Sequence, residues 1–216
     1  TFDVFDTALV RGVARPEGVF LQMAIEAQAS GILSQALLEC QDFIQARIKA
    51  ETEARRQAWE THGWVEIRLE EIHARLAVDL KLDEPSAQAL MSLEQRIELA
   101  HGLRNPFVGG LFDLAKGAGK RIGFISDMYL ASLLEQAGYG EYEFLLVSSS
   151  GRETKASGSL FKKVLNTQQI VSRKWLHVGD NPDSDVRRAR ELGIHALHYE
   201  KCETRSKSHP GTVRQT

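Results

Sequence analysis

Short apolar runs mark the second half of the chain, from Arg121 onward. Residues 122–125, 144–147 and 175–178 form continuous apolar stretches that helix-like segments separate. Such runs are typical of strands that are buried on both faces of a parallel sheet. The pattern therefore predicts strands at these three positions and a further strand at residues 194–197.

The segments between these strands have the composition of helices. We expect helices at residues 130–137, 159–165 and 184–192. Alternation of strand and helix favours right-handed crossovers between parallel strands. The predicted fold class is therefore α/β, with a doubly wound parallel sheet.

The stretch from Val13 to Leu103 shows a different pattern, because it contains no convincing strand and its apolar positions recur at helical spacing. These positions are Leu37, Cys40, Ile44 and Ile48, then Leu69, Ile72, Leu76 and Leu80, then Leu90, Leu93 and Ile97. We predict that residues 13–103 form an all-helical insert after the first strand. Residues 1–12 and 104–200 would form the α/β core, and residues 201–216 a polar tail.

Composition narrows the range of partners and locations. The 216 residues include 43% hydrophobic and 26% charged residues, with a net charge of −2. This balance provides no large positive field, so we expect no nucleic acid partner. The two cysteines, Cys40 and Cys202, have neither metal-ligand nor disulfide-framework spacing, which favours a reducing compartment.

The ends and the hydropathy of the chain give two further expectations. No apolar run approaches the roughly 20 residues that a membrane span needs, and no signal peptide is evident, so we predict no membrane span and a cytoplasmic location. The chain lacks an initiator Met, and only Thr1 and Phe2 precede Asp3. We therefore expect it to be a fragment of a longer protein.

Polar residues follow the ends of the predicted strands, where ligands collect in open α/β sheets. They are Asp3 and Thr7, Ser126 and Asp127, Lys155, and Gly179-Asp180. Acidic residues from different strands can hold Mg²⁺, a lysine can neutralise phosphate charge, and a hydroxyl can donate to a phosphoryl oxygen. These are the groups that phosphoryl transfer needs.

The order and spacing of these residues resemble the haloacid dehalogenase (HAD) superfamily along nearly the whole chain. Residues 2–7 (FDVFDT) look like its first motif, residues 124–126 (FIS) the second, Lys155 the third, and residues 179–185 (GDNPDSD) the fourth. The helical insert lies where the superfamily carries a helical cap. Residues 2–7 and 126–130 (SDMYL) also resemble a subgroup of HAD hydrolases that are fused to or associated with glycosyltransferases in polysaccharide biosynthesis.

The resemblance implies roles for individual residues. Asp3 would be the nucleophile that forms an aspartyl-phosphate. Mg²⁺ would be held by Asp3, the backbone carbonyl of Phe5 and Asp180, while Asp185 would hold metal-bound water or orient Lys155. Catalysis would also involve Ser126 and Lys155, which would bind the phosphoryl oxygens.

One position departs from the pattern of the superfamily's phosphatases. They carry a general acid-base aspartate two residues after the nucleophile, where this chain has Phe5. General acid-base catalysis contributes about 10²- to 10⁴-fold, so activity would be slow unless another group, such as Asp6, substitutes. An aromatic residue here also occurs in the superfamily's metal-independent dehalogenases, but these generally lack an acidic residue at the position of Asp180.

Several residues also have simpler interpretations. Arg11 and Arg104 flank the insert and could bind a substrate anion, or could be solvated. Ser126 and Asp127 could be helix caps, and Asp183 reads as a turn residue. The cap histidines His62, His73 and His101 have no ligand spacing.

The leading hypothesis is a Mg²⁺-dependent phosphohydrolase or phosphotransferase that acts on a small phosphorylated metabolite, such as a sugar phosphate. The alternative is a catalytically weak HAD-fold binding module of a larger biosynthetic protein. A metal-independent 2-haloacid dehalogenase is the least favoured reading because of Asp180.

Overall fold

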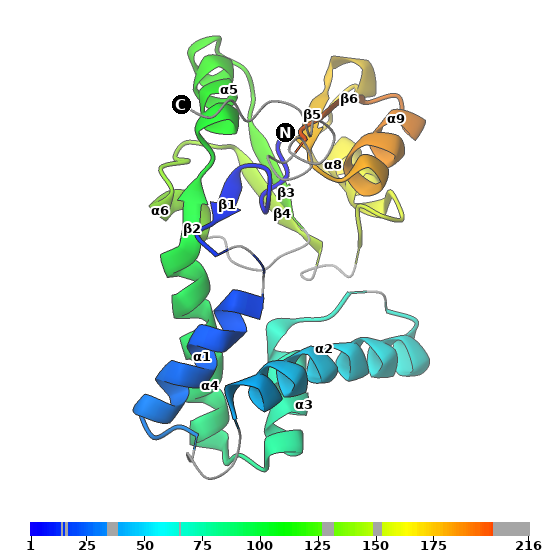
Figure 1. The fold of residues 1–216 in the computed structure, drawn as a ribbon. Coiled ribbons are helices and arrows are strands. Elements are labelled where there is room, and N and C mark those ends of the chain that lie inside the picture. The colour runs from blue at the N-terminus through cyan, green and yellow to red at the C-terminus, as the bar shows by residue number, and fades with distance from the viewer. Residues whose placement is uncertain are drawn as a thin grey trace, which may run out of the picture.

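A parallel sheet organises the α/β part of the molecule (Figure 1). The computed structural model describes residues 1–13, 15, 17–33, 39–64, 66–126, 132–148 and 153–200. Strand β3 (Gly123–Ser126) pairs with β4 (Phe144–Val147), and β5 (Leu176–Gly179) pairs with β6 (His195–His198). Parallel bridges join Phe2 to both Phe124 and Val178. The first residues of the chain therefore lie in the centre of the sheet, between β3 and β5.

Helices cover both faces of this sheet. Side chains of α5 (Pro106–Gly117) and α6 (Ser132–Gln136) share a buried cluster with Phe2 and Phe124. Side chains of α8 (Ser159–Thr167) and α9 (Arg188–Glu191) pack with Ile125 in a second cluster. Because successive strand residues point to opposite faces, Phe124 and Ile125 show which helices lie on which side. The predicted doubly wound α/β fold is confirmed.

A separate core holds the helical part together. The helical part consists of α1 (Glu17–Ala29), α2 (Cys40–His62), α3 (Leu69–Leu80) and α4 (Glu84–His101). The apolar positions that predicted these helices, apart from Leu37, which lies outside the described residues, are buried or partly buried. Among the described helices, none combines the length and apolarity that crossing a bilayer requires.

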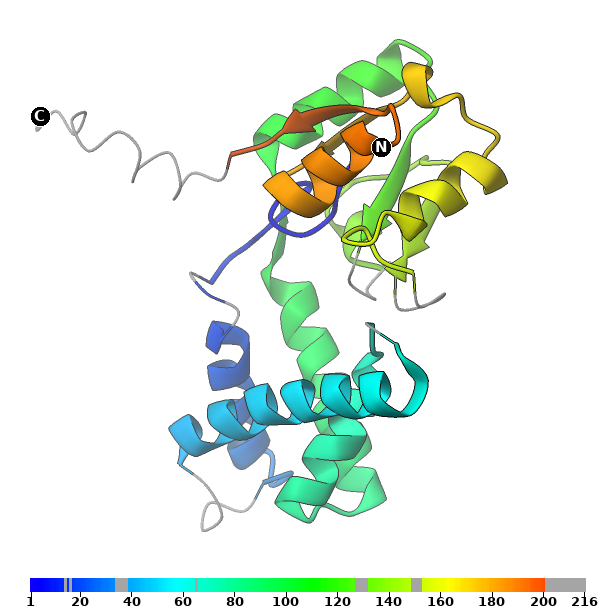
Figure 2. The ribbon, with the colours of Figure 1, turned by 90° about the vertical axis from the view of Figure 1, so that its right-hand side faces the viewer.

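Two short strands connect the helical part to the sheet. Strand β1 (Leu9–Arg11) pairs antiparallel with β2 (Gly102–Arg104), directly after α4. The expectation of no strand before Leu103 was thus wrong at Gly102 and Leu103, because a three-residue strand gives no readable alternation. Figures 1 and 2 show the four helices beside the carboxyl edge of the sheet, where the polar strand-end residues lie.

Helix α5 did not appear in the prediction from sequence. Gly109, Gly110 and Gly117 lower its intrinsic helix propensity. Its start is nevertheless well defined, because the side chain of Asn105 accepts hydrogen bonds from the backbone N–H groups of Phe107 and Val108, and Pro106 occupies the first turn. A capped start therefore outweighs weak propensity once one face of the helix packs on the sheet.

A buried ion cluster lies inside the helical part. Arg47 of α2 donates two hydrogen bonds to Glu94 of α4, at 2.9 and 2.7 Å, and His73 of α3 lies 2.8 Å from the same carboxylate. Burial alone raises the pKa of Glu94, but the hydrogen bonds from Arg47 and His73 outweigh it and lower the pKa to about 2. His73 is therefore a packing residue that ties α3 to α4.

Replacing Glu94 with Gln should lower the free energy of unfolding by about 3–5 kcal/mol, because Arg47 would remain buried without its counter-charge. Urea unfolding followed by circular dichroism measures this change. The matched control is Arg56→Gln, which removes exposed ion pairs with Glu53 and Glu60 of the same helix and should have little effect. Equal, small losses in both variants would contradict the importance of the buried cluster.

Candidate active site

Asp3 and Lys155 meet at the carboxyl edge of the sheet. Asp3 follows the central bridge residue Phe2, and Lys155 lies in a turn before α8. Both side chains are buried, and Lys155 Nζ donates a hydrogen bond to Asp3 Oδ1. Residues 152 positions apart in the sequence thus form one ion pair at the predicted site.

Asp185 holds the other side of the lysine. Its Oδ1 atom lies 2.7 Å from Lys155 Nζ and 3.3 Å from His177 Nε2. Its Oδ2 atom accepts a hydrogen bond of 3.0 Å from the backbone N–H of Asn181. Since both oxygens of Asp185 have donors, this carboxylate is arranged to orient Lys155, one of the two roles that the resemblance allowed.

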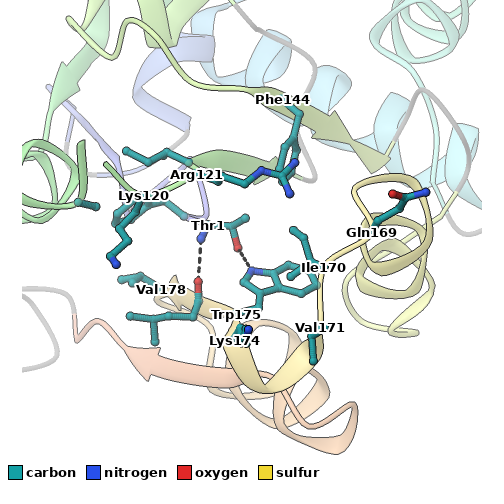
Figure 3. A pocket seen from close by; sticks show the side chains of 14 residues that line it. Thr1, Lys120, Arg121, Phe144, Gln169, Ile170, Val171, Lys174, Trp175 and Val178 are labelled. Atoms are coloured by element: carbon teal, nitrogen blue, oxygen red, sulfur yellow. Dashed lines mark hydrogen bonds between the residues drawn. The ribbon is translucent and has the colours of Figure 1, made fainter. Parts of the chain in front are cut away.

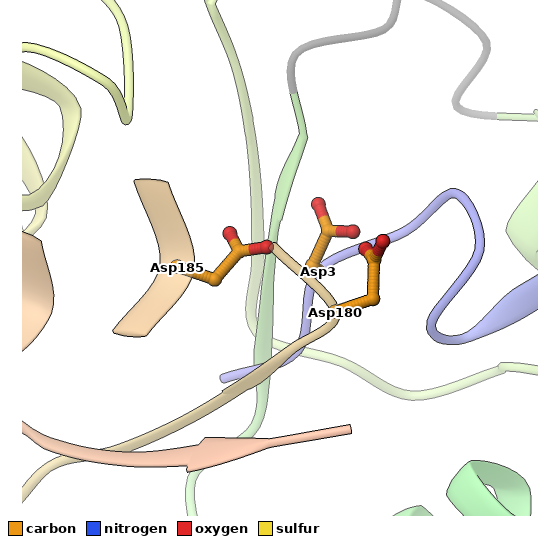
Figure 4. A group of neighbouring side chains, drawn as sticks. All are labelled: Asp3, Asp180 and Asp185. Atoms are coloured by element: carbon orange, nitrogen blue, oxygen red, sulfur yellow. The ribbon is translucent and has the colours of Figure 1, made fainter. Parts of the chain in front are cut away.

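Asp180 completes a group of three carboxylates (Figure 4). One oxygen each from Asp3, Asp180 and Asp185 lies within 4.8 Å of the other two. Thr7 Oγ1 donates a hydrogen bond of 3.1 Å to Asp180 Oδ1. This geometry agrees with the prediction that these acidic residues gather at one edge of the sheet. The hydroxyl of Thr7 is engaged with the Asp180 carboxylate.

Local backbone structure explains the spacing of the fourth motif. A Cβ atom at Gly179 would lie 2.4 Å from Cγ of Asp185, so only glycine leaves room for that side chain. The side chain of Asn181 accepts hydrogen bonds from Asp183 and Ser184 at the start of η2 (Pro182–Arg187). This cap turns the chain and carries Asp185 back toward Lys155.

The pKa values of Asp3 and Asp185, which both contact Lys155, shift in opposite directions. Burial raises the pKa of Asp3 to about 7, although the nearby Lys155 charge opposes the shift. Burial also acts to raise the pKa of Asp185, but the hydrogen bond from His177 and the charge of Lys155 lower it overall. The surroundings therefore favour the ionised form of Asp185, whereas burial disfavours the ionised form of Asp3.

The donor set fits a divalent cation such as Mg²⁺. The three carboxylates and Lys155 together carry a net charge of −2 when all are ionised. Carboxylate oxygens are the ligands that Mg²⁺ prefers. Asp3 and Asp180 are the candidates for direct ligation, because Asp185 is already engaged with Lys155, His177 and Asn181. Ligation by the Phe5 carbonyl stays a prediction.

The first loop places Phe5 and Arg11 together. The guanidinium of Arg11 lies 4.5 Å from the centre of the Phe5 ring. Arg11 also lies 3.4 Å from Glu98 of α4 and 3.8 Å from Asp6, which has a positive φ of 58°. Arg11 is therefore held between the loop and the helical part, and its predicted contact with a substrate anion stays a prediction.

Two other predicted residues have clear positions. Ser126 is buried at the carboxyl end of β3, at the same sheet edge as Asp3. Arg104 donates hydrogen bonds to Gly138, Gly109 and Asp113 and stacks on the Tyr139 ring, so it braces the α/β part. Asp127 lies outside the described residues.

Hydroxyl groups that the sequence reasoning missed support the lysine turn. Thr154 Oγ1 accepts from the backbone N–H of Ser157, and Ser159 Oγ accepts from the backbone N–H of Thr154. The Ser/Thr spacing around Lys155 was a readable signal for such a turn. His177 was also missed, because a histidine inside an apolar strand reads as a core residue.

A large cavity lies at the opposite edge of the sheet (Figure 3). It measures about 640 Å³, and its lining includes Thr1, Ile122, Phe144 and Trp175. These residues stand at the amino ends of the strands. The cavity is therefore separate from the carboxylate group at the carboxyl edge.

This architecture is a HAD-like fold, and solved structures show the same arrangement. A 2-haloacid dehalogenase from Pseudomonas syringae pv. Tomato matches with a TM-score of 0.66 and 16% identity, over 92% of this chain and 85% of that one. The HAD-hydrolase YfnB from Bacillus subtilis, solved with magnesium bound, matches with a TM-score of 0.57 and 14% identity, over 97% of both chains.

A sequence relative points the same way. The chain is 26% identical over 209 residues to haloacid dehalogenase-like hydrolase domain-containing protein 3 of Bos taurus. The aligned residues cover 91% of this chain and 79% of that protein. No protein-family model matches the chain. The chain is therefore similar in sequence to a HAD-like hydrolase domain-containing protein and similar in fold to solved HAD-like structures.

Proposed function

We propose that the protein is a Mg²⁺-dependent phosphohydrolase or phosphotransferase that acts through an aspartyl-phosphate on Asp3. The observation that carries this proposal is the group of three carboxylates, Asp3, Asp180 and Asp185, which have oxygens within 4.8 Å of one another, with Lys155 paired to both Asp3 and Asp185. A site with this charge binds a divalent cation and an anionic substrate together, whereas a neutral substrate would gain little from it.

Asp3 and Lys155 would perform the covalent step. An Asp3 oxygen attacks phosphorus, the bond from phosphorus to the leaving oxygen breaks, and that oxygen takes a proton as the alcohol departs. Lys155 and Ser126 would hold the phosphoryl oxygens. A bound Mg²⁺ would neutralise charge on the phosphoryl group and on Asp3. Water then attacks phosphorus, releases phosphate and restores Asp3.

Phe5 makes the proton transfers the slow part of this scheme. It provides no acid for the leaving oxygen and no base for the attacking water. Asp6, which could substitute, lies beside Arg11 at 3.8 Å. The proposal therefore includes low turnover on substrates with poor leaving groups, unless the substrate or a partner supplies the missing acid.

As the substrate we favour a small phosphorylated metabolite, such as a sugar phosphate or a related polysaccharide precursor. The resemblance to HAD hydrolases that are associated with glycosyltransferases supports this choice. We also propose that this protein is associated with a glycosyltransferase and lies in the cytoplasm.

Dehalogenation is a second candidate, because several structural neighbours are 2-haloacid dehalogenases by name and Phe5 fits their pattern. Phosphate release from sugar and aryl phosphates, with Mg²⁺ or with a chelator, distinguishes the two. Metal-dependent phosphate release supports the proposal. Chloride release from a 2-haloacid in the presence of chelator would replace it with dehalogenation, and no turnover of either kind would favour a binding module.

A further inference from the structure

We propose that His177 is a positioning residue for the carboxylate site: as the neutral tautomer with its proton on Nε2, it orients Asp185, which in turn holds Lys155 against Asp3. The inference rests on the function proposed above for Asp3 and Lys155. It assigns a role to a strand residue that belongs to none of the four motifs.

A chain of hydrogen bonds connects the two edges of the sheet through His177. Trp175 Nε1 donates to Thr1 Oγ1 at 2.7 Å, as Figure 3 shows. Thr1 Oγ1 lies 2.9 Å from His177 Nδ1, and His177 Nε2 lies 3.3 Å from Asp185 Oδ1. The chain thus reaches Asp185, which contacts the lysine.

For a neutral imidazole, the donors and acceptors at the two ends fix the direction of every bond. The indole N–H of Trp175 can only donate, so Thr1 Oγ1 accepts from it and can donate to His177. The ionised Asp185 can only accept, so His177 Nε2 must carry a proton. Nδ1 of His177 is then the acceptor for the Thr1 hydroxyl, and each polar atom in the chain has a partner.

Packing leaves the imidazole little freedom. The His177 side chain is fully buried, and the ring of Phe161 meets it edge-on at a centroid distance of 5.0 Å. Phe161 also packs against Trp175 at 5.8 Å. A buried neutral ring in fixed orientation is suited to hold one carboxylate oxygen in place.

Asp185 transmits this orientation to the site. Its Oδ2 atom is held by the backbone of Asn181, while Oδ1 is shared between His177 and Lys155. Without the imidazole, the carboxylate could rotate away from Lys155, and the lysine would lose its ion pair with Asp185. The charge around Asp3 would then be poorly arranged for a cation.

The first test needs no activity. Long-range ¹⁵N–¹H NMR of the imidazole nitrogens of the metal-free protein at neutral pH, with the His177 signal assigned by its loss in His177→Gln, reports the tautomer. We expect a protonated Nε2 and an unprotonated Nδ1. A proton on Nδ1, alone or together with Nε2, would overturn the proposal.

The second test compares Mg²⁺ binding by calorimetry in variants. His177→Phe keeps the ring but removes the donor, and we expect the dissociation constant for Mg²⁺ to rise roughly 10- to 100-fold. His177→Gln, which restores an amide donor, should recover part of the loss. It also serves as the test variant if the phenylalanine variant does not fold.

His73→Phe is the matched control, because His73 is a second buried histidine beside a carboxylate, Glu94 of the helical part. It should lower stability without changing the dissociation constant. Unchanged Mg²⁺ binding in folded His177 variants, or equal weakening in His73→Phe, would overturn the positioning role. If the wild type binds Mg²⁺ as expected but releases no phosphate, the proposed function fails while the positioning role stands.

Discussion

Replacing Asp3 with Asn should reduce Mg²⁺-dependent phosphate release by at least about a thousandfold. The amide cannot form the aspartyl-phosphate, and it also removes one negative charge from the group that would hold the cation. Because Lys155 donates to Asp3 Oδ1, the neutral amide also removes the charge of that ion pair. Both chemistry and cation binding should therefore suffer, and a steady-state assay with an aryl phosphate measures the loss.

Two further variants control this result. Asp3→Ala excludes recovery of activity by slow deamidation of the asparagine. Asp183→Asn changes an exposed aspartate of the fourth motif that pairs with Arg187, and it should leave turnover near the wild-type value. Turnover that persists in both Asp3 variants would contradict the assignment of the nucleophile.

Replacing Phe5 with Asp should raise turnover of an alkyl phosphate, such as a sugar phosphate, by about 10²-fold. This is the lower end of the usual gain from general acid-base catalysis. The reason for the lower end is Arg11, whose guanidinium lies 4.5 Å from the ring of Phe5. Its charge would favour the ionised form of the new carboxyl, so that a smaller fraction would be protonated and able to act as the general acid.

The leaving group provides the control for this prediction. The aryl oxide of an activated aryl phosphate departs without protonation. Formation of the aspartyl-phosphate from this substrate should therefore be accelerated little in Phe5→Asp. Phe5→Asn has nearly the same shape but no proton to exchange, and it should give no gain on either substrate. An equal gain in both variants would mean that removal of the bulky ring, rather than acid catalysis, is responsible.

Much of the fold was predictable because its signals are local. Continuous apolar runs predicted β3, β4, β5 and β6 within one or two residues. The helical spacing of apolar residues predicted α2, α3 and α4. Strands β1 and β2 were not predicted, because three residues show no periodicity. Helix α5 was not predicted, because its three glycines lower its helix propensity and only its capped start favours a helix. Both depend on tertiary packing rather than on local preference.

The sequence indicated which residues gather at the site but not which of their atoms are in contact. The motif spacing brought Asp3, Lys155, Asp180 and Asp185 together, since the carboxyl ends of parallel strands share one edge. Spacing could not show that Asp185 contacts Lys155 through one oxygen and the Asn181 backbone through the other. Nor could it show that Arg11 stacks on Phe5, because those contacts depend on the orientation of individual side chains, which spacing does not determine.

If Asp3 carries the phosphoryl group during turnover, the aspartyl-phosphate can be trapped. Because no base at Phe5 activates the attacking water, the intermediate from an activated aryl phosphate should form faster than it breaks down. Rapid acid quenching followed by peptide mass spectrometry should therefore find one added phosphoryl group on the peptide that contains Asp3, with Mg²⁺ and not with chelator. Turnover without this adduct, or an adduct on another residue, would contradict the account.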